Sequence, residues 1–387
     1  MRRPTARRNG HTVGVEPTDP GRSVPTDARP TPVRSRIRGI DIARGIAIIG
    51  MVMIHVGPQE TPGGGVVGAA YRSAHGRASI LFIVLAGVGV SLLTGDRSRP
   101  RLDGAVARLW WRALILLPAG LYLQAQPTNV AVILQYYAAY FIVASVLLRL
   151  DDRGLLAVAA ASATLGPVLL VWLQQAVPGW FQAGVPQWND AVRIVRDILL
   201  TGFYPVVTWT APLALGMWRG RRDLLGGAAR RMIAAGAIVA AFGFVVSDVL
   251  VALLGTPASE ADWRQLVAIE PHNEMPLWLV TSAGIAVAIT GCCIVMGQHL
   301  PRLSWPLVAF GQLALTTYVL HILVLTRWPE WLVRDDLVPA WQSVARFTVV
   351  SVALATAYRT VAARGPFEWL LRLSWQRTPR SSAPPAR

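Results

Sequence analysis

The chain has 387 residues, of which 53% are hydrophobic and only 15% charged, and its mean hydropathy is +0.44. The formal net charge of +16 is carried by arginine alone, because the sequence contains no lysine. Apolar runs long enough to cross a bilayer recur along the chain, which is typical of a polytopic helical membrane protein and leaves no room for a separate soluble domain. The arginine excess is therefore better explained by membrane topology than by nucleic-acid binding.

The chain divides into three parts by composition. Residues 1–36 are rich in Arg, Pro, Thr and Gly, contain no apolar run, and are expected to form a disordered cytoplasmic tail. They lack the apolar core of a cleavable signal peptide, so we expect the first span to act as a signal anchor. Residues 37–363 are the expected membrane domain, and residues 364–387 are expected to form a second cytoplasmic tail.

The membrane domain is predicted to be an all-α bundle of about ten spans with both termini in the cytoplasm. The expected cytoplasmic segments hold 28 of the 37 arginines and the external loops only seven, which satisfies the positive-inside rule for an even number of spans. The ten spans are expected near 39–57, 78–95, 109–124, 129–148, 154–177, 201–218, 232–254, 276–297, 305–325 and 340–362.

The first span, GIDIARGIAIIGMVMIH, is unusual because it carries Asp41, Arg44 and His55. Charged side chains are costly near the bilayer centre and usually face a protected interior or a polar pathway. At about 100° per residue, the eleven steps from Arg44 to His55 return to nearly the same helix face, roughly 16 Å further along. Asp41 lies one turn before Arg44 and is placed to pair with it. One helix is therefore predicted to hold an ion pair at one end and a histidine in line at the other.

Three further histidines are expected near the outer membrane surface with His55, and they are His75, His272 and His321. Histidine titrates near neutrality and is the commonest general base, so the cluster is a candidate site of proton transfer. The alternative is that these residues only mark places where helices meet headgroups and water. Asp248 and Arg346 also lie in the outer halves of their spans, where they are placed to neutralise each other.

Polar residues on both sides of the membrane are candidate binding groups. Arg108 and Arg112 lie on one helical face at the start of the third span, and paired guanidinium groups suit phosphate, although ordinary positive-inside flanking explains them too. In the outer loop IEPHNEMP, Glu270 is placed either to bind a polar acceptor or to be solvated. Trp209 offers either a stacking face for a sugar ring or core packing. The adjacent Cys292 and Cys293 have no metal-ligand spacing, and no metal is expected.

These motifs resemble two groups of membrane acyltransferases. D-x-x-R-G followed by His55, together with R-x-x-x-R at Arg108 and Arg112, resembles the acyltransferase-3 family of membrane O-acyltransferases. The rest of the chain looks closer to the heparan-α-glucosaminide N-acetyltransferase family and to domain of unknown function 418. The segments that carry this resemblance are GRASILFIVLAGVGVSLL (76–93), YPVVTWTAPLALGMWRGRR (204–222), FGQLALTTYVLHIL (310–323) and RGPFEWLLRLSW (364–375).

The resemblance implies roles for particular residues. In the acyltransferase-3 family the first-span Arg and His are linked to activity, and the paired arginines to the acyl-CoA donor, which implies such roles for Arg44, His55, Arg108 and Arg112. Arg77 falls at a position that is often basic in the heparan-type group. His75 falls in the loop that carries a histidine in the heparan-type enzymes, but its spacing to the following glycine differs and the acidic residue expected near it is missing.

The motifs and the resemblance together predict transfer of an acyl group, most simply acetyl, from cytoplasmic acetyl-CoA to an external sugar or other hydroxyl or amine acceptor. His55 would act as general base or carry the acyl group transiently. The rival hypotheses are a multi-pass transporter and a non-catalytic relative of the acyltransferases, although no internal repeat supports a transporter. The arginine-only basic complement and abundant alanine favour a high-GC bacterium, and hence the bacterial inner membrane.

Overall fold

The computed structural model describes residues 36–58, 65–94, 102–127, 130–181 and 190–373. These residues form helices, with no strand among them, so the all-α class is confirmed. The long helices are α1 (Arg38–Val56), α3 (Arg77–Leu93), α4 (Leu102–Gln124), α6 (Asp152–Ala176), α9 (Gly227–Leu254), α10 (Pro276–His299) and α14 (Leu337–Val361). Helices of intermediate length are α5 (Leu134–Leu147), α8 (Val206–Gly220) and α12 (Ala314–Arg327). The short elements are α2 (Gly65–Arg72), η1 (Pro178–Phe181), α7 (Ala191–Arg196), η2 (Asp197–Thr201), η3 (Trp263–Val267), α11 (Trp305–Gln312), α13 (Pro329–Leu332) and α15 (Pro366–Leu370).

Seven helices in the described part of the chain are long and apolar enough to cross a membrane, and nine if each of two bent pairs counts as one span. The bent pairs are residues 191–201 with 206–220, at 54°, and 305–312 with 314–327, at 72°. The span expected at 129–148 instead contains α5, whose 14 residues cover about 21 Å, short of the ~30 Å hydrocarbon core. The count of seven to nine thus replaces the expected ten. The cytoplasmic position of the termini stays a prediction.

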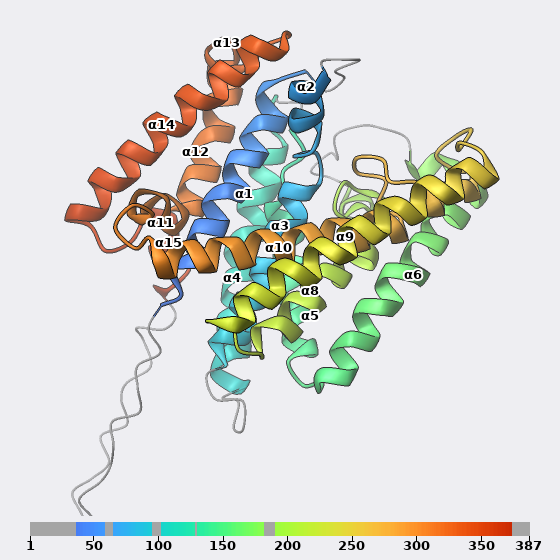
Figure 1. Cartoon of the computed structure of the whole chain (residues 1–387), viewed down its shortest axis with the longest axis horizontal. Coiled ribbons are helices and arrows are strands. Elements are labelled where there is room, and N and C mark those ends of the chain that lie inside the picture. Colours follow the sequence, from blue (N-terminus) through green and yellow to red (C-terminus); the bar gives the residue numbers. More distant parts are fainter. Residues whose placement is uncertain (1–35, 59–64, 95–101, 128–129, 182–189, 374–387) are drawn as a thin grey trace, which may run out of the picture. The chain divides into compact units, whose positions relative to one another are not determined.

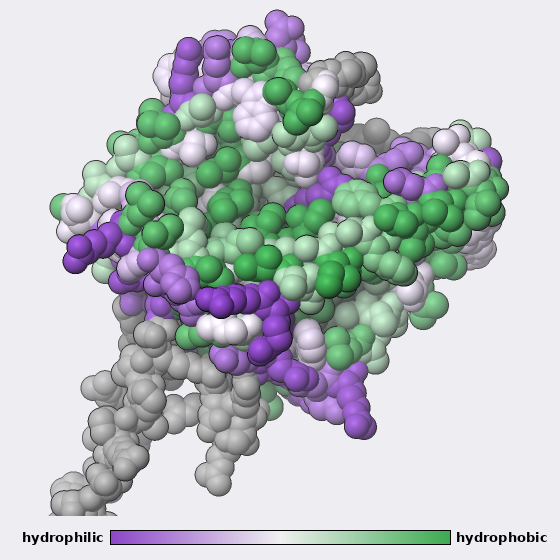
Figure 2. Space-filling model, in the orientation of Figure 1, coloured by the Kyte–Doolittle hydropathy of each residue, from purple (hydrophilic) through white to green (hydrophobic). Residues whose placement is uncertain are grey.

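Helix α1 lies at the centre of the bundle, packed against α3, α10, α11, α12 and α14 (Figure 1). In its apolar window 72% of the residues are buried by other parts of the protein, compared with 17% in α9 and in α14. Green side chains cover the face made by α9 in Figure 2, while purple ones gather where that helix begins. The polar residues of α1 therefore point into protein, whereas α9 and α14 form a periphery suited to lipid.

Glycines allow the closest helix contacts of the bundle. A Cβ atom built on Gly87 of α3 would lie 2.2 Å from the Leu213 carbonyl oxygen of α8, and one built on Gly216 would lie 2.2 Å from the Val84 carbonyl oxygen of α3. Only glycine fits at such distances, and small residues at helix interfaces are the usual means of close packing in membranes. The glycine-ended run of the second expected span thus serves to dock α3 on α8.

The chain enters and leaves the bundle at the same end. The start of α1 and the end of α14 are joined through Gln312 of α11, whose side chain contacts both Asp41 and Arg359. We call this the arginine end. At the opposite end, the Arg334 amide donates to the carbonyl of Val56 (2.8 Å), the last residue of α1. We call this the histidine end, because His55 lies there.

Candidate functional site

His55 and His321 form a pair at the histidine end. His55 Nδ1 lies 3.0 Å from His321 Nε2, and the two ring planes are 9° apart. His321 is fully buried beside the rings of Tyr318 and Phe347. The two histidines are 266 positions apart in sequence, and the contact joins α1 to α12. A hydrogen bond between two imidazoles couples their tautomers, because one ring has to donate and the other accept, and it orients both rings as a general base requires.

His75 and His272 lie close enough to His55 for their charges to interact with it. His75 is buried between α2 and α3, and its Nε2 atom has no hydrogen-bond partner; the same holds for Nδ1 of His272. Burial, with a contribution from His75, lowers the pKa of His272 to about 4, so the ring is neutral at physiological pH. The four histidines predicted to share one side are thus brought into one region, and three of them, His75, His272 and His321, have a buried ring nitrogen without a hydrogen-bond partner.

Trp209 is fully buried in α8 and shares two ring neighbours, Tyr204 and Trp278, with His272. Its indole Nε1 donates to Glu274 Oε1 at 3.0 Å, and the rings of Tyr204 and Trp278 pack around it. The buried position of Trp209 leaves no open face for stacking, so a contribution to acceptor binding has to pass through Glu274. Burial raises the pKa of the Glu274 carboxyl well above its usual value, which keeps it protonated.

The buried carboxyl of the outer loop is Glu274 and not the expected Glu270, which is exposed. His272 and Glu274 both have positive φ angles, of 57° and 59°, in the left-handed region that non-glycine residues rarely adopt. Asn273 holds this turn, since its side chain donates to the Ala268 carbonyl and accepts from the Met275 amide. The sequence could have indicated Glu274 because it lies two residues before α10 begins, where a side chain can turn into the bundle.

Arg77, at the start of α3, makes contacts with Phe244 and Ser73. Its guanidinium lies over the Phe244 ring of α9, with 5.6 Å to the ring centroid, and it also donates to the Ser73 carbonyl at 3.2 Å. Asp248 and Arg346 are exposed on α9 and α14, and no ion pair between these two described residues is present. The expected neutralisation of one by the other is therefore wrong.

At the arginine end, Asp41 and Arg44 form the predicted ion pair at 2.9 Å. Asp41 is 1% exposed and also accepts from the Gln312 amide at 3.3 Å. Arg359 of α14 in turn donates to Gln312 Oε1 at 2.8 Å. A relay of hydrogen bonds thus connects α1, α11 and α14. The Nη2 atom of Arg44 lies next to Gly89 of α3, 3.5 Å from the place that a Cβ atom on this glycine would take.

Arg108 and Arg112 lie close to this ion pair. Arg108 donates to the carbonyls of Gly104 (2.7 Å) and Leu93 (3.3 Å), which ties the start of α4 to the end of α3. Arg112 lies over the Phe141 ring, its buried Nε has no hydrogen-bond partner, and Arg44, Arg108 and Arg372 are near enough to repel its charge. Four arginines from α1, α4 and the segment after α15 therefore lie near one another, and one of them, Arg44, is paired with the Asp41 carboxylate. Such an excess of guanidinium groups suits a polyanion.

The G-P-F-E-W signature packs against the arginine end. Glu368 of α15 accepts hydrogen bonds from the Thr316 amide at 3.0 Å and the Thr316 hydroxyl at 2.6 Å, and so caps the first turn of α12. Trp111 Nε1 of α4 donates to the Leu370 carbonyl at 3.2 Å. The described residues 364–373 thus belong to the bundle, although the sequence favoured a tail from residue 364.

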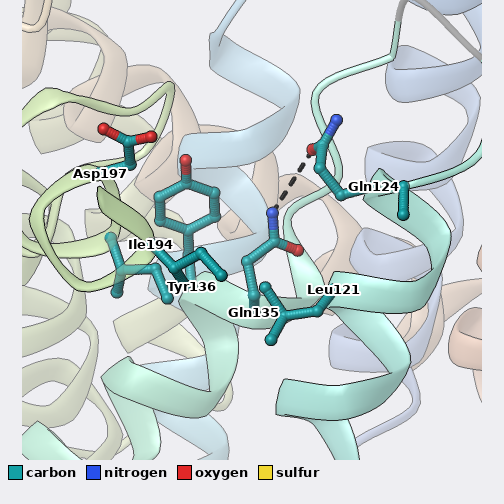
Figure 3. Close-up of a pocket in the computed structure, with 8 residues that line it drawn as sticks. Leu121, Gln124, Gln135, Tyr136, Ile194 and Asp197 are labelled. Atoms are coloured by element: carbon teal, nitrogen blue, oxygen red, sulfur yellow. Dashed lines mark hydrogen bonds between the residues drawn. The ribbon is translucent and has the colours of Figure 1, made fainter. Parts of the chain in front are cut away.

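A small cavity with both polar and apolar walls lies at the histidine end between α4, α5 and η2 (Figure 3). Gln124, Gln135, Tyr136 and Asp197 line it, with a volume of about 30 Å³. Gln124 and Gln135 bond to each other at 3.4 Å, and Gln135 Oε1 is buried without a partner. A cavity of this size holds about one water, which would satisfy the amide oxygen. It is too small for an acceptor sugar.

Both cysteines are free thiols, and within the described residues no three His, Cys, Asp or Glu side chains gather as a metal ion would require. The expectation of a metal-free site stays a prediction.

Residues 36–246 match the family described as heparan-alpha-glucosaminide N-acetyltransferase, catalytic, and residues 219–377 match a protein family of unknown function, DUF418. No curated protein matches the chain significantly. The first match covers more than half of the chain and includes α1, the paired arginines, His75 and Trp209, while the second includes His272, Glu274, His321 and the closing signature. The chain therefore belongs to the heparan-alpha-glucosaminide N-acetyltransferase family.

Proposed function

We propose that the protein transfers an acetyl group from acetyl-CoA, bound at the arginine end, to a hydroxyl or amine acceptor at the histidine end. The family match supports acetyl transfer as the class of reaction. The observation that carries the proposal is the central helix α1, which holds Arg44 in the arginine cluster and His55 in an imidazole pair about 16 Å away. We place the arginine end at the cytoplasmic surface of a bacterial inner membrane, because acetyl-CoA is made in the cytoplasm.

The arginine cluster is suited to the phosphates of acetyl-CoA. Arg44, Arg108 and Arg112 come from two different helices, and Asp41 with Gln312 holds the first of them in place. A guanidinium binds phosphate through two parallel hydrogen bonds, and three such groups neutralise much of the donor's charge. The pantetheine arm would then run along the Arg44–His55 face of α1 and bring the thioester to the histidine end.

The imidazole pair is suited to general-base catalysis. If His55 donates its Nδ1 hydrogen to His321 Nε2, the Nε2 lone pair of His55 is free to accept a proton. The acceptor nitrogen or oxygen would attack the thioester carbonyl carbon and pass its proton to His55 Nε2. The C–S bond then breaks, and the same proton goes to the departing CoA sulfur. His321 orients the base and stabilises the imidazolium, as the third member of a catalytic triad does.

The loop residues His272 and Glu274 are suited to hold the acceptor. Glu274, kept protonated by burial and fixed by Trp209, offers a neutral carboxyl, and His272 and His75 present unpaired ring nitrogens. Neutral hydrogen-bonding groups of this kind match a sugar better than a charged acceptor. Arg77 and Glu270, which were also expected to bind substrate, would have to leave their present positions to do so.

Binding of acetyl-CoA to the purified protein in nanodiscs is the first test. We expect micromolar binding by the intact protein and its loss in the double variant Arg108→Ala, Arg112→Ala. Substitution of Arg230 and Arg231, two arginines at the start of α9 that lie outside the cluster, is the matched control. An intact protein that binds no acetyl-CoA would contradict the proposal and favour a transporter or a non-catalytic relative.

A further inference from the structure

An open groove of about 560 Å³ lies along the G-P-F-E-W signature at the arginine end. Its walls include Tyr358 from the end of α14, Arg364 from the turn, and Phe367, Trp369 and Leu370 from α15. This volume falls within the range of small-molecule sites, whereas the cavity beside Gln135 holds one water. The hydrogen bonds of Glu368 explain how the signature is attached to α12, but they do not explain a groove lined by aromatic rings.

The groove offers exposed aromatic surface. The Tyr358 and Trp369 side chains are 38% and 49% exposed. Tyr358 is held in place because its hydroxyl donates to the Arg364 carbonyl at 3.0 Å, and the Arg364 side chain is exposed beside it. Rings that are fixed and yet accessible suit a planar partner, since aromatic stacking tolerates any base and gains further from a neighbouring guanidinium.

The groove adjoins the arginine cluster. Leu370 lines it, and the carbonyl of Leu370 accepts a hydrogen bond from Trp111, the neighbour of Arg112. Two residues beyond Leu370, Arg372 is within electrostatic range of Arg112. A planar ring bound in the groove would therefore have the arginine cluster on its Leu370 side.

We propose that this groove binds the adenine nucleoside end of the acyl-CoA donor, with the base against Trp369 and Tyr358 and the phosphates toward Arg372 and Arg112. The inference rests on the proposed acetyl transfer and names its donor subsite. A single tryptophan at the membrane interface would be explained as a membrane anchor, but here Trp369 and Tyr358 line one groove together. The occupant is a nucleotide and not a lipid tail because the aromatic groove adjoins the positively charged arginine cluster, which attracts phosphates.

The test separates the nucleotide from the rest of the donor. Trp369→Ala should weaken binding of acetyl-CoA and of adenosine 3′,5′-bisphosphate about 5- to 100-fold in nanodiscs, and Trp369→Phe should restore most of the affinity. Turnover of S-acetyl-pantetheine, which lacks the nucleotide, should be unchanged in both variants. Trp305→Ala is the control, since Trp305 is 37% exposed at the same end but lies outside the groove.

Three other outcomes are informative, and each contradicts either the groove assignment or the proposed acetyl transfer. Equal loss of acetyl-CoA and S-acetyl-pantetheine turnover would show a structural role for Trp369 and overturn the groove assignment. Unchanged nucleotide binding together with lost binding of labelled phosphatidylglycerol would identify a lipid site and overturn it too. Tight binding of adenosine 3′,5′-bisphosphate that depends on Trp369, without acetyl transfer to any acceptor, would uphold the groove and contradict the proposed enzyme.

Discussion

The two ends of α1 use polar residues in opposite ways. At the arginine end, arginines are in excess: Arg44 pairs with the buried Asp41, and Arg108 and Arg372 are near enough to Arg112 for their charges to interact. At the histidine end the groups are imidazoles, a protonated carboxyl and an indole, several of them with ring nitrogens that have no partner. The first arrangement attracts an anion from water, whereas the second suits proton transfer and uncharged hydrogen bonding. A helix that joins both explains why charged residues are tolerated inside a membrane protein.

The largest expected effect is on the rate of acetyl transfer, and it tests whether catalysis at the histidine end is separate from acetyl-CoA binding at the arginine end. His55→Ala should lower acetyl transfer about 10²- to 10⁴-fold, the usual contribution of a general base, and leave the affinity for acetyl-CoA unchanged. Turnover and binding are measured on the same nanodisc preparation. His299→Ala is the matched control, because His299 is an exposed histidine at the end of α10. Transfer within a few-fold of the original protein would exclude His55 as the base.

The next effect concerns the stability of the arginine end. Asp41→Asn removes the carboxylate from a buried pair and leaves Arg44 and the Gln312–Arg359 contact without their common partner. Breaking a buried ion pair costs several kcal/mol, and since Arg44 is 31% exposed we expect about 3 kcal/mol, near the lower limit. The thermal unfolding midpoint in detergent should fall accordingly.

Asp248→Asn serves as the control for Asp41→Asn, because Asp248 is exposed on α9. Its unfolding midpoint should stay within a degree or two of the original value. Equal shifts in both variants would mean that the relay through Gln312 contributes nothing to stability. The comparison also shows whether the arginine end is held together by its ion pair or by helix packing alone.

The sequence could predict much of the fold, since apolar runs of membrane-spanning length located the long helices. It also paired Asp41 with Arg44, because that contact spans only three residues of one helix. The length of α5 was not predictable, since the apolar residues 130–133 continue the pattern although they form no regular helix. The bend between α11 and α12 at Leu313 could not be predicted either, because no proline lies at this position.

The candidate site depends on contacts between segments far apart in the chain. The sequence placed His55 and His321 at the same end, but their hydrogen bond depends on how α12 leans after the 72° bend. The sequence favoured Glu270, although the buried carboxyl is Glu274, four residues further on. Spacing alone does not show which carboxyl points inward, because the direction of the loop is set by the positive φ angles of His272 and Glu274. Gln312 carries no charge and so gave no signal, although it links Asp41 to Arg359.

A third effect tests the environment of the histidine end. Because the pKa of His272 is lowered to about 4 from 6.5, the unfolded state binds the proton more readily between these values. The contribution of His272 to stability is therefore complete above pH 6.5 and is lost as the pH falls toward 4. The side chain is only partly buried, so we expect a loss of ~2 kcal/mol or less. His272→Asn should flatten this part of the stability curve, and an unchanged slope would show that His272 is solvated.

The smallest effect distinguishes a neutral acceptor site from a charged one. Burial raises the pKa of Glu274, so its stabilising contribution is complete below the ordinary value and is lost as the pH rises through the folded-state value. Near neutrality Glu274→Gln replaces one uncharged side chain by another of the same shape, keeps an oxygen for Trp209 Nε1, and should change stability by less than ~1 kcal/mol. Glu274→Leu leaves the buried indole without a partner and should cost about 1–3 kcal/mol. A large loss in the Gln variant at pH 7 would mean that Glu274 is ionised there, in which case the histidine end would hold a negative charge and would favour a cationic amine over a sugar hydroxyl.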